Sequence, residues 1–226
     1  MSDSFPRVRS YVIRTARMSV AQKNAYSNFS SRWVIPHNEV PVDLSELFTG
    51  TQKYILEIGF GMGDATRRMA QEHPEWGILA VEVHKPGIGK LLWWIDRENL
   101  KNLYIIEGDA VEVLSDVIPE GSLDGIHIWF PDPWPKKKHH KRRLIQTDFA
   151  LKIKMALKSG GYVHAATDWQ PYADHILSVL TQTPGLSNRF ESWAEKPDYR
   201  PETRFENRGI AARRIIRDII FDKENP

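Results

Sequence analysis

The stretch YILEIGFGMGDATRRMAQEH, from Tyr54 to His73, decides the fold class of this chain. An apolar run leads into a turn that contains Gly59, Gly61 and Gly63, and an amphipathic segment follows the turn. This pattern is typical of a buried strand that turns tightly into a helix. The alternation repeats, with strands predicted at 54–59, 77–83, 102–109, 122–130 and 160–168 and helices at 64–73, 86–99 and 142–157. It predicts an α/β fold with a doubly wound, mostly parallel sheet that helices cover on both faces.

The composition is that of an ordinary soluble globular protein. The 226 residues suffice for one domain with a sizeable core, and 41% are hydrophobic and 27% charged. No apolar stretch approaches the roughly 18 residues of a membrane helix, and MSDSFPRVRS lacks the apolar core of a signal peptide, so we expect a cytoplasmic protein that binds no membrane. The chain has no cysteine, which excludes disulfides, thiolate metal sites and a thiol nucleophile. We expect no metal, because the adjacent His139 and His140 are not at ligand spacing.

Positive charge is concentrated in three segments, although the formal net charge is only +2. Residues 1–38 carry six basic and one acidic side chain, residues 136–154 carry eight and one, and residues 200–217 carry six and two. Such segregation predicts a positive face that binds a polyanion in a salt-dependent way. Each run by itself is also compatible with a solvated surface segment.

The first 50 residues differ from the rest of the chain. They show weak periodicity, scattered arginines and the breaker-rich stretch IPHNEVPVDL. We interpret residues 1–50 as a basic N-terminal arm and connector, and residues 51–226 as the α/β domain.

Acidic residues stand near the carboxyl ends of three successive predicted strands, where open α/β sheets bind their ligands. Glu57 precedes a G-x-G-x-G turn, and a carboxylate there suits a ligand with ammonium and sulfonium charges, such as S-adenosylmethionine, better than a pyrophosphate. Glu82 could accept hydrogen bonds from both ribose hydroxyls and Asp109 from the adenine amino group, although Asp109 could equally cap the next helix. These residues predict the cofactor crevice of a class I S-adenosylmethionine-dependent methyltransferase, lined by Glu57, Gly59, Gly61, Gly63, Glu82 and Asp109.

The run FPDPWPKKKHHKRR, Phe130–Arg143, follows the fourth predicted strand. Its prolines fix φ and remove backbone donors, so the run is neither helix nor strand interior, and Asp132 is held rigidly between two of them. Trp134 offers a surface on which a base could stack, and six Lys or Arg and two His follow at once. We predict methylation of a nucleobase beside Asp132. Without a cysteine, pyrimidine C5 cannot be activated covalently, so the target should be an atom with its own lone pair.

Several motifs resemble those of the tRNA (guanine-N7-)-methyltransferase family, in this order: EIGFGMG, AVEVH, GDA, FPDPWPKKKHHKRRL, ATDW and TRFENRG. The resemblance runs from about Arg7 to about Phe221, and RVRSYVIRTARMS looks like the family's basic N-terminal segment. It implies methyl transfer from S-adenosylmethionine to N7 of the variable-loop guanosine of tRNA. It also implies a seven-stranded sheet whose last strand, Ile215–Phe221, is an antiparallel edge strand.

The resemblance implies roles for individual residues. Asp132 would be catalytic and would line the cofactor with Glu57, Glu82 and Asp109. The residues that would contact the substrate are Lys136, Asp168, Thr203, Arg204, Phe205 and Glu206, and those that would contact RNA are Lys138, His139, His140, Lys141, Arg142 and Arg143. Helix capping is the alternative for Asp168, before a helix near Gln170, and for Arg142 and Arg143. We expect a monomer or homodimer without an obligatory protein partner.

Two features of the sequence leave other readings open. Family members often have glycine and histidine after the RG of the last motif, whereas this chain has RGIAARR, which affects the backbone expected between Ile210 and Arg214. Asp-Pro-Pro-aromatic elbows serve enzymes that methylate exocyclic amines, although the order here is Pro-Asp-Pro-Trp. A non-catalytic RNA-binding protein on the same fold is a further alternative, against which the full set of carboxylates and glycines argues.

Overall fold

The computed structural model describes residues 8–12, 17–37 and 41–225. The predicted basic arm therefore lies partly outside the described residues, at positions 1–7 and 13–16. The strands are β1 (Val34–Ile35), β2 (Lys53–Ile58), β3 (Trp76–Glu82), β4 (Leu103–Glu107), β5 (Leu123–Trp129), β6 (Leu157–Thr167), β7 (Leu186–Asn188) and β8 (Arg217–Lys223). The helices are α1 (Val20–Trp33), α2 (Leu44–Leu47), α3 (Asp64–Glu72), α4 (Lys85–Arg97), α5 (Ala110–Asp116), α6 (Thr147–Ala156), α7 (Gln170–Thr181) and α8 (Arg204–Ala211), and a 3-10 helix covers Lys137–Arg142.

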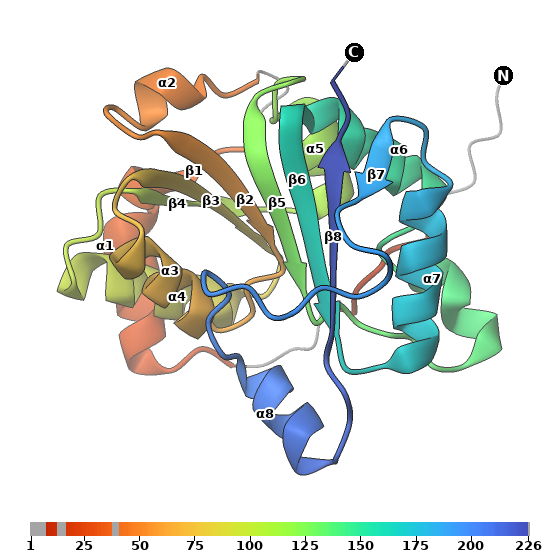
Figure 1. Ribbon diagram of the computed structural model, residues 1–226. Coiled ribbons are helices and arrows are strands. Elements are labelled where there is room, and N and C mark those ends of the chain that lie inside the picture. The colour runs from red at the N-terminus through yellow and green to blue at the C-terminus, as the bar shows by residue number, and fades with distance from the viewer. Residues whose placement is uncertain (1–7, 13–16, 38–40, 226) are drawn as a thin grey trace, which may run out of the picture.

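One sheet runs through the molecule in the order β1-β4-β3-β2-β5-β6-β8-β7 (Figure 1). The pairs from β1 to β6 are parallel, and β8 pairs antiparallel with both β6 and β7. From the middle of the sheet, chain order runs through β2, β3 and β4 toward one side and through β5 and β6 toward the other, so it reverses between β2 and β5. The parallel strands on both sides of this point end at the same edge of the sheet. A crevice at that edge is where open α/β sheets bind ligands.

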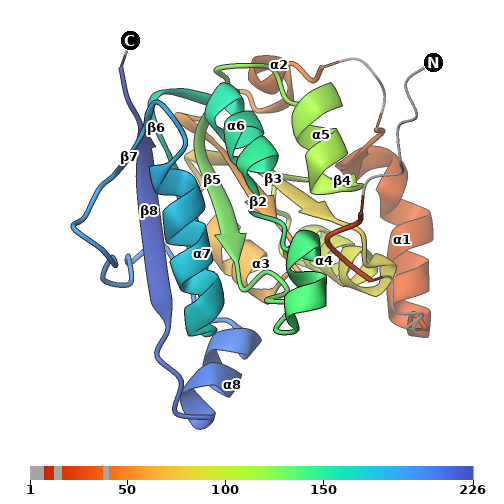
Figure 2. The same ribbon diagram turned by 90° about the vertical axis from the view of Figure 1, so that its right-hand side faces the viewer.

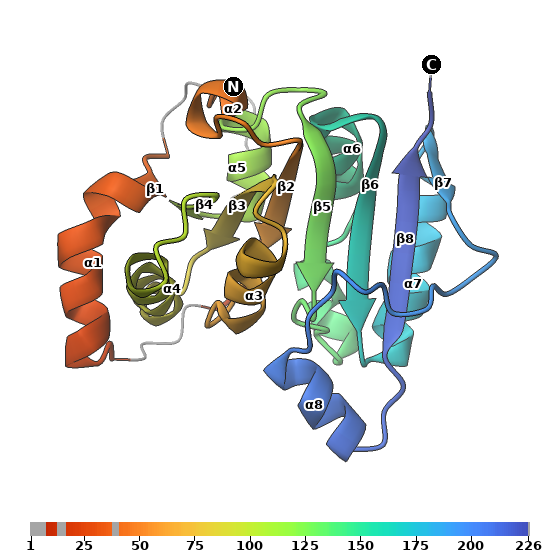
Figure 3. The same ribbon diagram turned by 60° about the vertical axis from the view of Figure 1, so that its left-hand side comes forward.

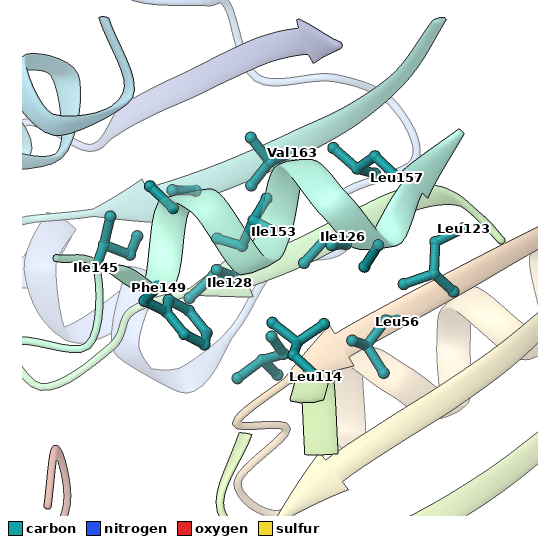
Figure 4. Packing of buried hydrophobic residues seen from close by; sticks show 14 of the residues in the cluster. Leu56, Leu114, Leu123, Ile126, Ile128, Ile145, Phe149, Ile153, Leu157 and Val163 are labelled. Atoms are coloured by element: carbon teal, nitrogen blue, oxygen red, sulfur yellow. The ribbon is translucent and has the colours of Figure 1, made fainter. Parts of the chain in front are cut away.

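Helices cover both faces of the sheet (Figures 2 and 3). One hydrophobic cluster joins α1, α3 and α4 to the sheet, and the other joins α2, α5, α6 and α7 to its opposite face. Successive side chains of β2 alternate between them, since Leu56 belongs to the second cluster and Ile55 to the first. Figure 4 shows Leu56 packed with Ile126, Leu114 and Phe149 between the strands and the helices of the second cluster. Burial on both faces explains why the strand sequences are almost continuously apolar.

The predicted fold class is confirmed, and three details differ. In the described part of the chain the sheet has eight strands instead of seven. The last strand is antiparallel, as expected, but β7 pairs with its outer side, so β8 is not at the edge. The helix predicted from residue 142 begins at Thr147, because the 3-10 turn ends at Arg142 and residues 143–146 form an irregular connection.

Part of the first 50 residues packs onto the domain. Helix α1 begins at Ser19 with a capping box in which Gln22 is the second partner, and it lies against α4. The strand β1 adds to the sheet beside β4. The domain boundary at residue 50 stays a prediction. The contacts show that α1 packs on a helix of the α/β domain and that β1 extends its sheet. No helix within residues 8–12, 17–37 and 41–225 is long and apolar enough to cross a membrane.

Candidate functional site

A cavity of about 210 Å³ lies beyond the carboxyl ends of β2, β3, β4 and β5. Its lining comes from the segments that follow these strands, from the N-terminal residues 10 and 11, and from α8. The lining residues are Ser10, Tyr11, Ile58, Gly59, Gly61, Val81, Glu82, Val83, Gly108, Ala110, Trp129, Phe130, Pro131, Asp132, Leu144 and Phe205. A second, smaller hollow shares the glycine turn and Phe205 and adds Glu57, Asp64 and Arg204 to the lining. The two hollows meet at the place where the sequence predicts the methyl donor.

The glycine turn presents bare backbone to this cavity. Gly61 has a φ of 60° and Gly63 a φ of 75°, in the left-handed region that favours glycine. No atom of residues 8–12, 17–37 and 41–225 lies within 4 Å of the position where a Cβ on Gly61 would stand, so a ligand can approach its backbone closely. Gly87 of α4 packs directly against the turn, since a Cβ there would come within 1.8 Å of the Gly61 carbonyl oxygen. Gly59, predicted as a ligand residue, also has a positive φ of 80° and open space around it.

Glu57 is a buried carboxylate at the end of β2. Its side chain is 4% exposed, and its Oε2 has no hydrogen-bond partner among the residues that the structure describes. Burial, together with the nearby charge of Glu82, raises the pKa of Glu57 from its ordinary value of 4.5 to about 7. The nearby Thr66 hydroxyl opposes part of this rise in pKa, but a buried oxygen without a hydrogen-bond partner, such as Oε2, is costly. A cationic group on a ligand would satisfy it. The site therefore fits a methyl donor that carries ammonium and sulfonium charges.

Glu82 ties two loops of the site together. Its Oε2 accepts a hydrogen bond from the Gly61 amide at 2.8 Å, and its Oε1 accepts from the amides of Val83 and His84 at 2.8 and 3.1 Å. The sequence analysis did not foresee these backbone contacts. A carboxylate has about four acceptor positions, so Oε2 keeps capacity for a ribose hydroxyl.

Asp109 caps α5, which is the alternative to an adenine contact that the sequence leaves open for this residue. Its Oδ1 accepts from the Val111 amide at 2.9 Å, and the side chain is buried. Its neighbours Gly108 and Ala110 line the cavity. The capping bond fixes the backbone at the end of β4, and a contact between Asp109 and the cofactor stays a prediction.

The elbow after β5 contains two residues in the left-handed region. Phe130 has a φ of 54° and Trp134 a φ of 43°, so they bracket the exposed Asp132, which lines the cavity. For a residue with a Cβ such a conformation costs about 1–3 kcal/mol and persists where the surroundings enforce it. The elbow is thus more constrained than its prolines alone require.

Two side chains hold the elbow in place. Arg143 is buried, its Nε donates to the Pro133 carbonyl at 3.1 Å, and its guanidinium lies over the Tyr172 ring at 5.0 Å. The Trp134 indole nitrogen donates to the Ser10 carbonyl at 2.9 Å, which ties the N-terminal segment to the elbow. The guanidinium of Arg142 lies 5.1 Å from the centre of the Trp134 ring. The role of Trp134 as a stacking surface for a base stays a prediction.

Comparison with known proteins identifies the family. A family model described as "Putative methyltransferase" matches residues 51–219. A tRNA (guanine-N(7)-)-methyltransferase of Nitrosomonas europaea is 51% identical over 220 residues, which cover 97% of this chain and 98% of the relative. The chain belongs to the tRNA (guanine-N7-)-methyltransferase family.

Further matches agree with the membership. A tRNA (guanine-N(7)-)-methyltransferase of Methylobacillus flagellatus is 50% identical, with 96% of this chain and 92% of the relative covered. Among solved structures, the 16S rRNA methyltransferase KamB superposes with a TM-score of 0.59 at 13% identity, covering 97% of this chain and 99% of that chain. At that identity the likeness shows a shared fold.

The TRFE motif of this family member divides into two pairs of residues. Thr203 and Glu206 form a capping box at the start of α8: the Thr203 hydroxyl accepts from the Glu206 amide at 3.0 Å, and Glu206 accepts from the Thr203 amide. Arg204 and Phe205 line the smaller hollow together with Thr203, and Phe205 also lines the larger cavity. Phe205 is 53% exposed, and its ring lies 6.4 Å from the Phe130 ring at an angle of 19°.

Asp168 is paired instead of capping a helix. Its Oδ2 accepts from Arg214 at 2.9 Å, and the N-cap of α7 is Trp169 without a side-chain bond. Arg214 belongs to RGIAARR, the segment that departs from the family pattern. In this chain α8 ends at Ala211, and Arg213 takes a φ of 56°, which brings Arg214 back to Asp168. The altered segment therefore contacts a predicted substrate residue.

The predicted RNA-contacting run is mostly exposed. Lys136, Lys138 and Lys141 are exposed, and His139, His140 and Arg142 are half-buried. Arg143 departs from the prediction, because its buried guanidinium holds the elbow and does not reach the surface. In the described part of the chain, no three His, Cys, Asp or Glu side chains are grouped so that they could hold a metal ion.

Sequence analysis missed two parts of the site. Ser10 and Tyr11 line the cavity, and Ser10 accepts a hydrogen bond from the elbow although it lies more than a hundred residues before it. Only the basic character of the arm hinted at a role. Arg200, at 1% exposure, pairs with Glu206, and nothing local in PDYRPE indicates that this arginine is buried.

Proposed function

We propose that this protein transfers the methyl group of S-adenosylmethionine to N7 of the variable-loop guanosine of tRNA, which gives N7-methylguanosine. The observation that carries the proposal is the 51% identity, over nearly the whole of both chains, to a protein named for this activity. The crevice with its buried, unpartnered carboxylate supports it. Neither rival, exocyclic-amine methylation nor RNA binding without catalysis, is favoured by the curated relatives' names.

The residues around the glycine turn would hold the methyl donor. When bound, S-adenosylmethionine supplies an electrophilic methyl group on a sulfonium centre. Ionised Glu57 would attract the cationic part of the ligand, and the open backbone at Gly59 and Gly61 would allow close approach. Gly63 would shape the turn, because Leu91 fills the position where its Cβ would stand. Glu82 would accept from the ribose hydroxyls with its remaining capacity. Asp109 and the segment around it would bound the adenine.

Asp132 is the proposed catalytic residue. Guanine N7 has an in-plane lone pair and carries no proton near neutral pH, so the reaction needs no general base to expose it. Positive charge moves onto the purine as the new bond forms. A carboxylate held on a rigid, exposed elbow could stabilise that charge, or accept a hydrogen bond from guanine N1 or the amino group and so enrich N7 in electrons.

Residues on α8 and the neighbouring loops would receive the base. Phe205 offers an exposed ring at the mouth of the cavity, and Arg204 stands beside it near Asp64, with 3.4 Å between the Arg204 Nε and the Asp64 Oδ2. Stacking on an aromatic side chain is worth about 1–3 kcal/mol per base. Lys136 and Asp168 are the further proposed substrate contacts. Thr203 and Glu206 would act through the capping box that orients the helix.

The exposed cations would bind the RNA backbone. Lys138, His139, His140, Lys141 and Arg142 adjoin the elbow, so phosphates beside the reacting base would meet them. Such contacts position the RNA without reading its sequence, so the choice of one guanosine would come from RNA shape. We further propose that the protein acts in the cytoplasm as a monomer or homodimer.

The test is transfer of labelled methyl groups to unmodified tRNA transcripts, followed by chemical cleavage at N7-methylguanosine. We expect label in the tRNA and cleavage in the variable loop. A transcript with adenosine in place of that guanosine is the matched control and should take up no label. Labelling that persists with the control transcript, or labelled tRNA that is not cleaved in the variable loop, would refute the proposed site.

A further inference from the structure

Arg200 is a fully buried cation that joins two elements of the site. It lies in the loop before α8 and exposes 1% of its surface. One guanidinium nitrogen donates to Glu206 Oε2 at 2.8 Å, and the other donates to Glu206 Oε1 at 3.1 Å and to Asp218 Oδ2 at 3.0 Å. Glu206 belongs to the first turn of α8 and Asp218 to β8. Arg200 therefore fixes the helix to the sheet through its guanidinium.

The contacts continue from β8 to the wall of the cavity. Asp218 Oδ1 lies 2.8 Å from His164 Nε2, and the Trp129 indole nitrogen donates to His164 Nδ1 at 3.3 Å. Because Nδ1 accepts, Nε2 carries the proton that is donated to Asp218. Trp129 lines both hollows and immediately precedes Phe130. An unbroken set of contacts thus links α8, which carries Phe205, to the base of the elbow.

The two carboxylates of this network, Asp218 and Glu206, stay ionised because cations and hydrogen-bond donors face them. Burial acts to raise the pKa of Asp218, but the hydrogen bond from His164 and the charge of Arg200 outweigh it, and the pKa is lowered. Glu206 behaves in the same way, with Arg200 and Lys196 as the outweighing partners. Replacing buried ion pairs by apolar residues is often neutral or stabilising, so stability alone is weak grounds for such an arrangement. Its geometric effect is to fix α8 against the elbow.

We infer that Arg200 is a positioning residue, which holds α8 so that Phe205 and Arg204 face the base while Phe130 and Asp132 face the methyl donor. The inference rests on the proposed function. It differs from the role that the resemblance implies for Glu206, since Glu206 is here an anchor for Arg200 in place of a substrate contact. Misplacement of a contact residue by about 1 Å can lower turnover about a hundredfold.

Two substitutions test the inference. Arg200→Lys keeps the charge but cannot bridge two carboxylates with a planar fork. Asp218→Asn alters the far end of the network, on β8, where no substrate contact is proposed. Glu195→Gln is the matched control, because Glu195 is an exposed residue of the same loop before α8 and lies outside the network.

We expect both network variants to lower kcat/KM for tRNA about tenfold to a hundredfold, with the Kd for S-adenosylmethionine, measured by calorimetry, within about twofold of wild type. Amide hydrogen exchange should speed up in residues 204–211 and stay unchanged in β2 and β3. Glu195→Gln should match wild type in all three measurements. Wild-type kcat/KM in Asp218→Asn, or exchange in residues 204–211 that is unchanged in both variants, would overturn the inference. If the wild-type protein labels no tRNA, the proposed function fails, whereas the exchange measurement still tests whether Arg200 and Asp218 hold α8.

Discussion

Replacing Glu57 with Gln should stabilise the protein without ligand while weakening its binding of the methyl donor. The folded state raises the pKa of Glu57 from 4.5 to about 7, mainly by burial. Below pH 4.5 the group is neutral in the folded and unfolded states alike. As the pH rises from 4.5 to 7 the unfolded chain ionises first, so this group progressively lowers the free energy of unfolding. The loss levels off above pH 7.

The size of the effect follows from the shift. Each pKa unit corresponds to 1.36 kcal/mol, so the full shift amounts to about 3 kcal/mol, most of it lost between pH 5 and pH 8. A neutral glutamine cannot ionise and should escape the loss. Its amide would still lack a partner in the buried position of Oε2, which offsets part of the gain. Relative to wild type, Glu57→Gln should therefore gain about 2–3 kcal/mol in going from pH 5 to pH 8.

The assay is urea unfolding of the ligand-free protein at pH 5, 6, 7 and 8, with Glu120→Gln, an exposed position away from the crevice, as control. Calorimetry with S-adenosylmethionine should show wild-type affinity that rises about tenfold between pH 6 and pH 8, as Glu57 ionises, and a flat, weak response in Glu57→Gln. A stability difference between wild type and Glu57→Gln that does not change with pH would show that Glu57 titrates normally. The account of the crevice would then be wrong.

Three further predictions concern the elbow, the helix and the basic run. Asp132→Ala should lower the single-turnover rate about a hundredfold or more, with the Kd for tRNA within about threefold; a wild-type rate would remove Asp132 from the mechanism. Phe205→Ala should raise the KM for tRNA about tenfold, and Ile210→Ala, on the same helix and 56% exposed, should leave it unchanged; equal effects from both would contradict a stacking role. Lys138→Gln should reduce the slope of log K for tRNA against log salt by about 0.7–0.9, whereas Arg143→Lys should lower the Tm and leave the slope alone; a flatter slope in Arg143→Lys would contradict its assignment to the elbow.

The crevice could be predicted because its signals are local. An apolar run, a glycine turn and a carboxylate two residues before the first glycine occupy one short stretch, and the structure places Glu57 and Gly61 on the cavity. The same reasoning located Glu82 at the end of β3. The sequence could not predict the burial and the hydrogen bonds of each carboxylate. Burial of Glu57 and the three backbone contacts of Glu82 depend on neighbours that are distant in the sequence.

The errors have the same origin. The two-residue β1 and three-residue β7 are too short to show periodicity, and they exist because β4 and β8 offer open edges. Burial of Arg200 and Arg143 depends on tertiary partners, so each resembles a surface cation in the sequence. The capping box of Thr203 and Glu206, by contrast, could have been predicted from the sequence, because a threonine followed three residues later by glutamate is a recognised capping signal. The substrate contacts that the family resemblance implies for both residues stay a prediction.

Gly87 has a consequence for genetic screens of this protein. Gly87 lines neither hollow, yet a Cβ there would come within 1.8 Å of the Gly61 carbonyl oxygen in the glycine turn. A random mutagenesis experiment scored by loss of methylation would therefore recover Gly87 alongside the carboxylates, and a map of intolerant positions would mark it as part of the reaction centre. Substitutions of Gly87 would be harmful because two backbone segments lie too close together to admit a side chain between them. Weak residual activity that improves at low temperature would distinguish such a steric allele from one that has lost a reacting group.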